Sequence, residues 1–490
     1  MATCLTHPTA GYYTSKESVF GPGGDFVTGP DVSQLMGELV GVWCASEWAG
    51  ALGQPPAVRL VELGPGRGTL MADLLRGAVG LAGGAWAAAV REVVLVEVSP
   101  ARRAEQWAAL ACCRAAEGGS GPAAAPLTPT PPPSSDGRPP IQRALSLLTV
   151  PKGAAPLAVT WAASLADVPA AGPPTLYLAH EFFDALPVHH FQRVDAGQGG
   201  RRRRKERGPP SPSSSSSSSS STPSLFPVAA AWRERLVDAA PPGGPGPPFR
   251  FVLAPGPTPA STTILLRRLA SLDEKTLAGL EGLEVCPAGM AAAGELARRV
   301  SGAAGRAEME REEGGGGAGD AAASPGASDG AGAALIIDYG RAGPPYADSL
   351  VGIANHAPAG VLASPGRVDL SARVDFGALA AAAVEEAGAG SVAVHGPIPQ
   401  AHFLLGLGLA ARLAALEVAA GGPDTEAGRA VRLGALRLVG GHEEGGDEAG
   451  SAPPASEGDD DDGDAPVEGM GYTYQAMALT RAGRGPPAPF

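Results

Sequence analysis

The chain has 490 residues, of which 70 are glycine and 49 are proline, and it carries a net charge of −13. Ten acidic residues between Glu443 and Asp464 supply most of that charge, so the remainder of the chain is close to neutral. A nearly neutral body lacks the basic face that displaces counterions from phosphates, which excludes a nucleic-acid-binding protein.

The five cysteines show none of the paired spacings that hold zinc, so the sequence predicts no metal site. No uncharged run of 18 apolar residues is free of glycine and proline, and we therefore expect no transmembrane helix. The first residues carry neither an apolar signal core nor an arginine-rich amphipathic presequence. We expect either a cytosolic protein or a sequence that begins internally.

Several stretches are too rich in glycine, proline, serine or acidic residues to bury a core. We expect disordered insertions at 114–140, 195–224, 241–248, 301–332 and 442–467. The other residues suit one large domain or two small ones. We divide them into an N-terminal lid and helix at 1–50, a first part of the core at 51–194, and a remainder at 225–490 that includes substrate-side elements.

The segment Gly11–Asp31 is rich in glycine but also in aromatic residues, which disordered linkers seldom carry. It therefore predicts a loop that folds over the core. Asp31 is expected to cap the helix that follows, with Gln34 at the capping-box spacing. One interpretation of the loop is a structural lid, and the other places Asp25 and Thr28 at the border of a bound cofactor.

Short runs of β-branched residues alternate with helical ones along the rest of the chain. We expect strands at Val58–Leu63, Glu92–Val98, Thr175–Ala179, Arg250–Leu253 and Ala334–Asp338, and an edge strand at Tyr472–Thr480. This alternation predicts an α/β fold, in which helices cover both faces of a mostly parallel sheet.

The sharpest motif is the segment from Glu62 to Thr69, GluLeuGlyProGlyArgGlyThr, which ends the first strand and opens a helix. Glycines let the backbone turn tightly and approach a ligand, and the helix offers free N–H groups. An NAD site would need glycine in place of Thr69, and a P-loop would need a GlyLysSer or GlyLysThr ending. A plain structural turn is the remaining alternative.

An acidic residue, such a loop and then Glu97 at the end of the next strand form the arrangement of S-adenosylmethionine-dependent methyltransferases. In that arrangement the second carboxylate accepts hydrogen bonds from the ribose hydroxyls. We predict cofactor contacts at Glu62, Gly64, Pro65, Gly66, Gly68 and Glu97, together with Asp25 and Thr28 of the loop.

Glu181 and Asp184 follow the strand Thr175–Ala179, at the edge where open α/β sheets bind ligands. We predict that they hold and activate the substrate, and so are the catalytic residues. The alternative is that Glu181 caps the next helix and Asp184 pairs with a nearby base. Asp338 ends another strand in the same way, whereas Asp369 and Asp375 are expected to be helix caps.

Many blocks of the chain closely resemble the MidA family. The matching blocks are GlyTyrTyr at Gly11, GlyAspPheValThr at Gly24, GluLeuGlyProGlyArgGlyThrLeu at Glu62, LeuValGluValSer at Leu95, HisGluPhePheAspAlaLeuProVal at His180, GluValCysProAla at Glu284, AspTyrGly at Asp338, AspLeuSerAlaArgValAspPhe at Asp369 and GlyProIleProGlnAlaHisPheLeu at Gly396. They follow the family order and cover most of the chain outside the expected insertions.

The resemblance implies a Rossmann-like methyltransferase sheet with an N-terminal lid and inserted or C-terminal elements. It implies S-adenosylmethionine as cofactor and localisation in the mitochondrial matrix, because mitochondrial members are protein arginine methyltransferases that act in complex I assembly. The implied substrate is an arginine of a matrix-arm core subunit of complex I, dimethylated symmetrically by a type II enzyme. Family members have sequence before the GlyTyrTyr block, so we expect this chain to begin internally.

Two rival functions stay open. One is a non-catalytic complex I assembly chaperone that retains the methyltransferase fold, and the other is a small-molecule methyltransferase. The intact glycines, Glu97 and the strand-end carboxylates favour an enzyme. The oligomeric state, a homodimer included, is not indicated by the sequence.

Overall fold

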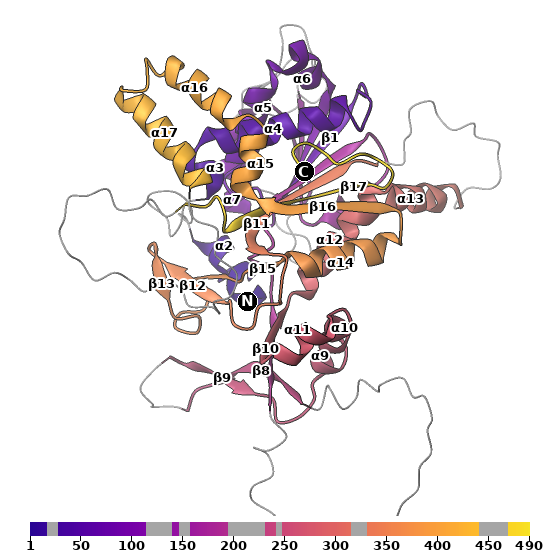
Figure 1. Cartoon of the computed structure of the whole chain (residues 1–490), viewed down its shortest axis with the longest axis vertical. Coiled ribbons are helices and arrows are strands. Elements are labelled where there is room, and N and C mark those ends of the chain that lie inside the picture. Colours follow the sequence, from indigo (N-terminus) through magenta and orange to yellow (C-terminus); the bar gives the residue numbers. More distant parts are fainter. Residues whose placement is uncertain are drawn as a thin grey trace, which may run out of the picture. The chain divides into compact units, whose positions relative to one another are not determined.

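The computed structural model describes residues 1–16, 28–113, 140–146, 157–194, 231–241, 247–314, 331–440 and 469–490. The chain forms two compact units (Figure 1). The larger consists of Met1–Leu186, Ala288–Gly343 and Leu350–Phe490, and the smaller of Pro187–Pro287 and Pro344–Ser349. Most of the expected insertions 114–140, 195–224, 241–248 and 442–467 lies outside the described residues, as do half of 301–332 and Asp25.

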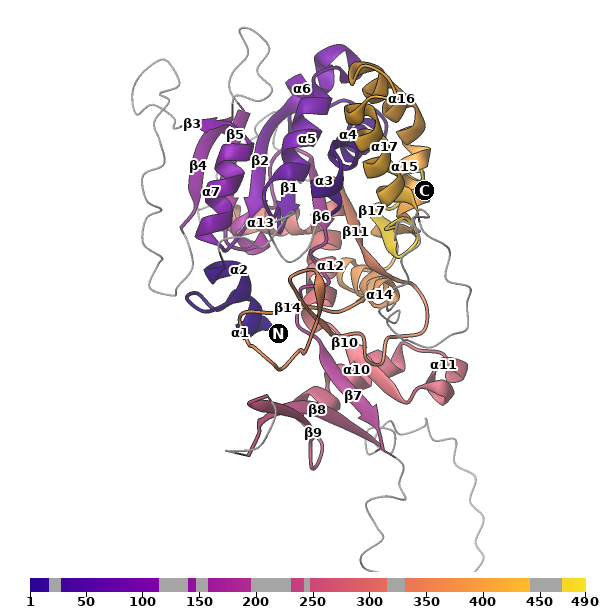
Figure 2. The ribbon, with the colours of Figure 1, turned by 90° about the vertical axis from the view of Figure 1, so that its left-hand side faces the viewer.

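The larger unit is built on a sheet with the strand order β16-β17-β11-β6-β1-β2-β5-β4-β3 (Figure 2). Five neighbouring strands in its middle are parallel, namely β1 (Val58–Leu63), β2 (Val90–Val96), β5 (Leu157–Ala162), β6 (Thr175–His180) and β11 (Ala333–Arg341). Antiparallel strands flank them, namely β3 (Cys112–Cys113), β4 (Gln142–Ser146), β16 (Val392–Pro399) and β17 (Tyr474–Arg481). The short strand β15 (Val374–Asp375) pairs with the end of β11.

Helices cover both faces of this sheet, which confirms the predicted fold class (Figure 2). Successive residues of β1 alternate between the two faces, because side chains of a strand point in opposite directions. Leu60 packs into one core with α4 (Gln34–Ala49) and α5 (Thr69–Ala78), whereas Val61 packs into the other with α12 (Pro287–Val300) and α14 (Phe376–Ala387).

The other helices of the larger unit are α1 (Ala2–Thr6), α2 (Tyr12–Ser15), α3 (Gly29–Val32), η1 (Leu81–Gly84), α6 (Ala85–Ala89), α7 (Pro100–Ala109), η2 (Leu165–Asp167), α13 (Ala303–Gly314), α15 (Gln400–Gly406), α16 (Leu409–Ala419) and α17 (Glu426–Val439). A small sheet contains β12 (Val351–Ala354), β13 (Ala357–Ala359) and β14 (Asp369–Ser371). In the described part of the chain no single helix is long and apolar enough to cross a membrane. The helices α15 and α16, which are joined at a sharp bend, reach the necessary length and apolar composition only when they are taken together.

The smaller unit contains an antiparallel sheet of order β10-β7-β8-β9. Its strands are β7 (His189–Arg193), β8 (Trp232–Ala239), β9 (Phe249–Leu253) and β10 (Gly282–Val285), and its helices are α9 (Pro259–Thr262), α10 (Ile264–Ala270) and α11 (Glu274–Gly279). The strand expected at Arg250–Leu253 exists as β9, but its place in the parallel sheet was wrong. Strand propensity predicts that a segment forms a strand, but it does not predict which other strand that segment pairs with.

Two further expectations were wrong. Tyr472–Thr480 is not an edge strand, because β17 lies between β11 and β16 and pairs with both. The start of the expected insertion 301–332 is helical, since α13 covers Ala303–Gly314 with alanine, glutamate and arginine, which are good helix formers.

Asp31 does not cap the long helix α4. Ser33 does so, and its hydroxyl accepts a hydrogen bond from the Leu35 N–H (3.3 Å). Asp31 lies one element earlier, in α3, where Pro30 opens a separate short helix. Asp31 instead accepts hydrogen bonds from the hydroxyls of Thr28 and Thr69.

Of the two other residues expected to cap helices, one does so and one does not. Asp375 caps α14 by accepting a hydrogen bond from the Ala378 N–H (2.9 Å), as predicted. Asp369 caps no helix and lies in β14, where its carboxylate accepts a hydrogen bond from the Tyr13 hydroxyl (2.9 Å).

The described residues on either side of 195–230 lie side by side, because Arg193 pairs with Trp232 across β7 and β8. We therefore expect that a short Gly/Ser linker in place of residues 197–221 shifts the melting temperature by only a few degrees. As a contrast, Gly37→Val should destabilise strongly, since even a Cβ there would lie 2.6 Å from the Asp73 Cβ. Scanning calorimetry measures both, and a linker variant that fails to fold would contradict the prediction.

Candidate functional site

A pocket lies at the carboxyl ends of β1 and β6. Strand β1 pairs with β2 on one side and with β6 on the other, and such a switch point is where open α/β sheets bind ligands. The space within the pocket is about 400 Å³ and includes room open to solvent. Its lining residues are Thr28, Pro30, Asp31, Glu62, Gly64, Pro65, Gly66, Arg67, Thr69, Leu70, His180 and Glu181.

The glycine loop forms one wall of this pocket and leads into α5. Gly64, Gly66 and Gly68 have φ values of +62°, +54° and +82°, in the region that side chains with a Cβ rarely adopt. A Cβ on Gly64 would also lie 2.8 Å from the Phe182 ring. The motif therefore needs glycine for its backbone shape, and it brings the N-terminus of α5 to the pocket.

Two buried polar atoms of the pocket have no hydrogen-bond partner within the described residues. They are Oε2 of Glu62 and Nε2 of His180. Burial raises the pKa of Glu62 to about 8 and lowers the pKa of His180 to about 4. Because an unpaired buried polar group is costly, these atoms indicate a polar ligand in the pocket.

Glu97 lies just beyond the end of β2, beside the loop, but it does not line the pocket. Its carboxylate accepts hydrogen bonds from the Ser99 N–H (2.7 Å) and from Nε2 of Gln106 (3.2 Å), and burial raises its pKa. Gln106 also donates to the Gly66 carbonyl (2.8 Å), so it ties Glu97 to the loop. A carboxylate has about four acceptor positions, which leaves Glu97 able to bind further donors.

Glu181 lines the pocket and begins the turn after β6, with a φ of +49° that is uncommon for a residue with a side chain. Its Oε1 accepts a hydrogen bond from the Gly29 N–H (2.9 Å). Burial, helped by the negative charges of Asp184 and Asp31, raises the pKa of Glu181 to about 8. No helix follows Glu181, so the alternative of a helix cap was wrong.

Asp184 lies in the same turn but does not line the pocket. Its Oδ2 accepts a hydrogen bond from the Ser371 hydroxyl (2.6 Å), which also contacts the Tyr339 hydroxyl (2.6 Å). The partner of Asp184 is thus a hydroxyl and not the basic residue of the alternative interpretation. Burial raises the pKa of Asp184.

Asp338 holds this turn in place from the neighbouring strand β11. Its fully buried Oδ2 accepts hydrogen bonds from the N–H groups of Phe182 (3.1 Å), Phe183 (2.8 Å) and Asp184 (3.4 Å). Burial and the charges of Asp184 and Glu181 raise its pKa. Asp338 therefore supports the turn that carries the two predicted catalytic residues.

The predicted site residues are thus only partly brought together at the pocket. Glu62, Gly64, Pro65, Gly66, Thr28 and Glu181 line it, whereas Gly68, Glu97 and Asp184 lie close by in the loop, strand end and turn described above. His180 and Asp31 also line the pocket and were missed. The one available signal for His180 was its place at the end of a buried strand, just before Glu181.

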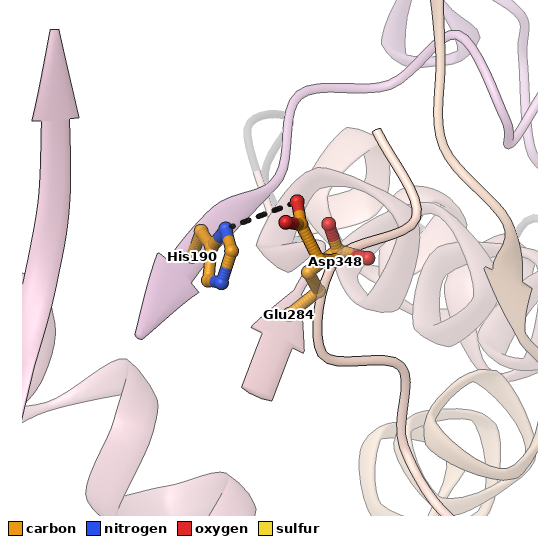
Figure 3. A group of neighbouring side chains, drawn as sticks. All are labelled: His190, Glu284 and Asp348. Atoms are coloured by element: carbon orange, nitrogen blue, oxygen red, sulfur yellow. Dashed lines mark ion pairs between the residues drawn. The ribbon is translucent and has the colours of Figure 1, made fainter. Parts of the chain in front are cut away.

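A second group of candidate ligands lies in the smaller unit, where His190, Glu284 and Asp348 approach one another (Figure 3). Other side chains already satisfy this group. Arg235 donates hydrogen bonds to Asp348 (3.2 Å) and to Nδ1 of His190 (3.3 Å). Ser349 donates to Glu284 through its N–H (2.9 Å) and its hydroxyl (2.5 Å). The geometry is therefore that of a structural charge network.

The raised pKa of Glu62 predicts how stability depends on pH. An acid whose pKa is higher in the folded state stabilises fully below its unfolded pKa of about 4.5, and this contribution is lost as the pH rises through about 8. We expect cofactor-free protein to lose stability between about pH 4.5 and about pH 8, and Glu62→Gln to remove about 5 kcal/mol of that loss. Urea unfolding across this range measures it.

The exposed Glu274 provides a matched control, since Glu274→Gln makes the same change outside the pocket and should follow the parent profile. If the profile of Glu62→Gln also runs parallel to the parent, the carboxylate is not protonated in the folded protein.

Comparisons with known proteins agree with this geometry. Residues 39–397 match the family model described as "Putative S-adenosyl-L-methionine-dependent methyltransferase". The chain is 35% identical over 428 residues to the mouse protein named protein arginine methyltransferase NDUFAF7, mitochondrial, which covers 87% of this chain and 73% of the relative. The zebrafish protein of the same name is 34% identical over 416 residues, 85% of this chain and 74% of the relative.

Among solved structures, the fold is similar to that of a Burkholderia thailandensis protein bound to S-adenosyl-homocysteine. The TM-score is 0.58 at 20% identity, and the match covers 98% of this chain and 86% of that one. The family match spans more than half of the chain, and the two relatives are over 30% identical to it across alignments that cover more than two thirds of their length. The chain therefore belongs to the MidA family of S-adenosyl-L-methionine-dependent methyltransferases.

Proposed function

We propose that this chain is a mitochondrial protein arginine methyltransferase. Its relatives carry that name, and one observation of the structure supports the substrate. Three carboxylates lie at neighbouring strand ends beside the pocket, namely the buried Asp338 and the half-buried Glu181 and Asp184. Within the described residues none of them forms an ion pair with lysine or arginine. An acidic group of this kind is suited to a cationic side chain from another molecule.

The finer part of the proposal rests on the family resemblance of the sequence. We propose the mitochondrial matrix as the compartment, and an arginine in a matrix-arm core subunit of complex I as the substrate. The proposed product is symmetric dimethylarginine. A small-molecule substrate or a chaperone without turnover remains as an outcome of the experiments below.

The pocket residues fit S-adenosyl-L-methionine. The unpaired Oε2 of Glu62 would accept hydrogen bonds from the cofactor's ammonium group, and the N–H groups at the start of α5 suit its carboxylate. Glu97 keeps acceptor positions for the ribose hydroxyls. Thr28, Pro65 and the loop glycines would complete the wall. The bound cofactor supplies a methyl group on a sulfonium sulfur.

The carboxylates would help an arginine side chain to act as a nucleophile. Guanidinium is a poor nucleophile, because it stays protonated up to a pKa of about 12 or higher and its lone pairs are delocalised. Glu181 and Asp184 would hold the guanidinium, draw its positive charge toward the nitrogens that they contact, and free the remaining nitrogen to attack. A nitrogen–carbon bond forms as the sulfur–carbon bond breaks, and the nitrogen's proton passes to a carboxylate, for which Glu181 lies nearest the pocket.

We expect two variants to lose affinity for S-adenosyl-L-methionine. Gly66→Val puts a branched side chain at a φ of +54°, and Glu97→Ala removes hydrogen bonds to a charged group, each worth about 1.5 to 3 kcal/mol. Calorimetry should show affinities at least about tenfold weaker. Gly80→Val is the control, because a Cβ on Gly80 meets nothing within 4 Å. If both variants fold and bind S-adenosyl-L-methionine with the parental affinity, the assignment of this pocket to the cofactor is wrong.

We expect Glu181→Gln and Asp184→Asn to keep cofactor affinity but to slow methyl transfer about a hundredfold or more. Removing one charged partner of a guanidinium costs about 2 to 4 kcal/mol in the transition state. Labelled cofactor mixed with mitochondrial extract, followed by analysis of the labelled protein for methylated arginine, measures the transfer.

The control variants for this assay are Glu274→Gln and Asp424→Asn, which make the same substitutions at exposed positions. If Glu181→Gln and Asp184→Asn methylate at the parental rate, the two carboxylates are structural. Label on a small molecule instead of a protein would favour the small-molecule enzyme, and binding without any transfer would favour the chaperone.

A further inference from the structure

A strand from a distant part of the chain holds the turn that carries Asp184. The Ser371 hydroxyl of β14 donates a hydrogen bond to Oδ2 of Asp184 (2.6 Å), and the Ala372 N–H donates to the Asp184 carbonyl (3.0 Å). Ala185, the next residue of the turn, packs against an apolar cluster that includes Leu370 of β14. The same strand therefore contacts the side chain, the backbone and the neighbour of Asp184.

The hydrogen bonds at the buried Ser371 run in one direction. A serine hydroxyl has a single proton, and Ser371 gives that proton to Asp184. The Tyr339 hydroxyl lies 2.6 Å from the Ser371 oxygen, so it is the donor in that contact. Hydrogen bonds that follow one another in this way polarise and strengthen each other. Ser371 is thus held by one hydrogen bond while it donates the next.

The N-terminal helices anchor β14 in turn. Asp369 lies two residues before Ser371, so both side chains point to the same face of the strand. Oδ1 of Asp369 accepts a hydrogen bond from the hydroxyl of Tyr13, which is part of α2 (2.9 Å). Leu370 points the other way and belongs to one apolar cluster with Leu5 of α1 (Figure 2). Contacts on both faces therefore fix the strand that supports Asp184.

We propose that Ser371 is a positioning residue of the methyl-transfer site, which orients the Asp184 carboxylate toward the substrate guanidinium. The proposal rests on the proposed function, since Asp184 is one of the two carboxylates that would hold the arginine. A guanidinium presents its donors in a rigid planar fork, so a carboxylate that binds it needs a defined rotation. A donor fixed on Oδ2 sets that rotation and leaves further acceptor positions for the substrate.

A hydroxyl group suits this task because it carries no charge. A lysine or arginine in the same place would neutralise Asp184 and would compete with the cationic substrate. Ser371 instead donates one hydrogen bond, which favours the charged form of the carboxylate. Burial raises the pKa of Asp184, and the hydrogen bond from Ser371 acts in the opposite direction. Asp184 thus keeps its capacity to bind a cation.

The first test is the initial rate of transfer from labelled S-adenosyl-L-methionine to proteins of a mitochondrial extract, with the full chain and limiting extract. We expect Ser371→Ala to lower this rate about tenfold, which corresponds to about 1.4 kcal/mol. Ser371→Thr keeps a hydroxyl and should restore most of the rate. Calorimetry should show parental affinity of Ser371→Ala for S-adenosyl-homocysteine, because Ser371 does not line the pocket. A parental rate of folded Ser371→Ala overturns the proposal.

A double-mutant cycle shows whether Ser371 acts through Asp184. The background is Asp184→Ala, because an asparagine would keep an amide oxygen that Ser371 could bind. On this background Ser371→Ala should leave the rate unchanged, since no carboxylate remains for the hydroxyl to orient. A tenfold fall on both backgrounds would show that Ser371 acts elsewhere, and so would overturn the proposal.

Ser349→Ala is the matched control. Ser349 also donates its hydroxyl to a buried carboxylate, that of Glu284 (2.5 Å), but it does so in the smaller unit. We expect this variant to transfer at the parental rate. If it is slowed as much as Ser371→Ala, the loss of such a hydroxyl has no specific link to Asp184, and the proposal is wrong.

The same cycle can be measured without activity, by urea unfolding of the cofactor-free protein. Ser371→Ala should destabilise the parent, and should cost less stability on the Asp184→Ala background, where the hydrogen bond is already lost. Equal costs on both backgrounds would overturn the proposal. Failure of the proposed function looks different, because the parent would then transfer no methyl group to arginine while the unfolding cycle would still show the coupling.

Discussion

Carboxylates buried at the ends of parallel strands are the constraint on which the rest of this site depends. Removing a charged carboxylate from water is unfavourable unless hydrogen bonds or a cation replace the water. Asp338 meets this need fully, with N–H donors from the turn after β6. Glu181 and Asp184 meet it only in part, through the Gly29 N–H and the Ser371 hydroxyl. Burial raises the pKa values of Glu181 and Asp184, because it disfavours their charged forms. A cation bound beside them would stabilise those charged forms.

The topology of the sheet places these carboxylates next to the pocket that the glycine loop lines. Strands β1, β6 and β11 are neighbours and parallel, so their carboxyl ends share one edge. The glycine loop follows β1, the Glu181 turn follows β6, and Asp338 lies at the end of β11. A methyl donor bound at the loop and a cation bound at the turn would therefore meet over adjacent strands, which is the arrangement that methyl transfer needs.

Local sequence was enough to predict part of this site. The loop from Glu62 to Gly68 could be predicted because glycine is the residue type that readily adopts a positive φ. Each of the three loop glycines has such a φ. The strands β1, β2, β6 and β11 could be predicted because they are short segments rich in β-branched and other apolar residues, most of which are buried. Glu181 could be placed at the pocket because it directly follows one of these strands.

Contacts between distant segments could not be predicted in this way. Ser371 reaches Asp184 only because β14 returns to the turn after β6. Nothing in the run that became β17 showed that a further strand would cover its outer side. His180 was overlooked for a similar reason, since only the folded pocket shows that its Nε2 is buried without a partner.

The most direct test of the account is a crystal structure of the protein with S-adenosyl-homocysteine and an arginine-containing peptide. The account predicts the adenosyl ligand against the glycine loop, and the guanidinium within hydrogen-bonding distance of both Glu181 and Asp184. A peptide arginine bound elsewhere, while Glu181 and Asp184 keep only their contacts to Gly29 and Ser371, would contradict this mechanism.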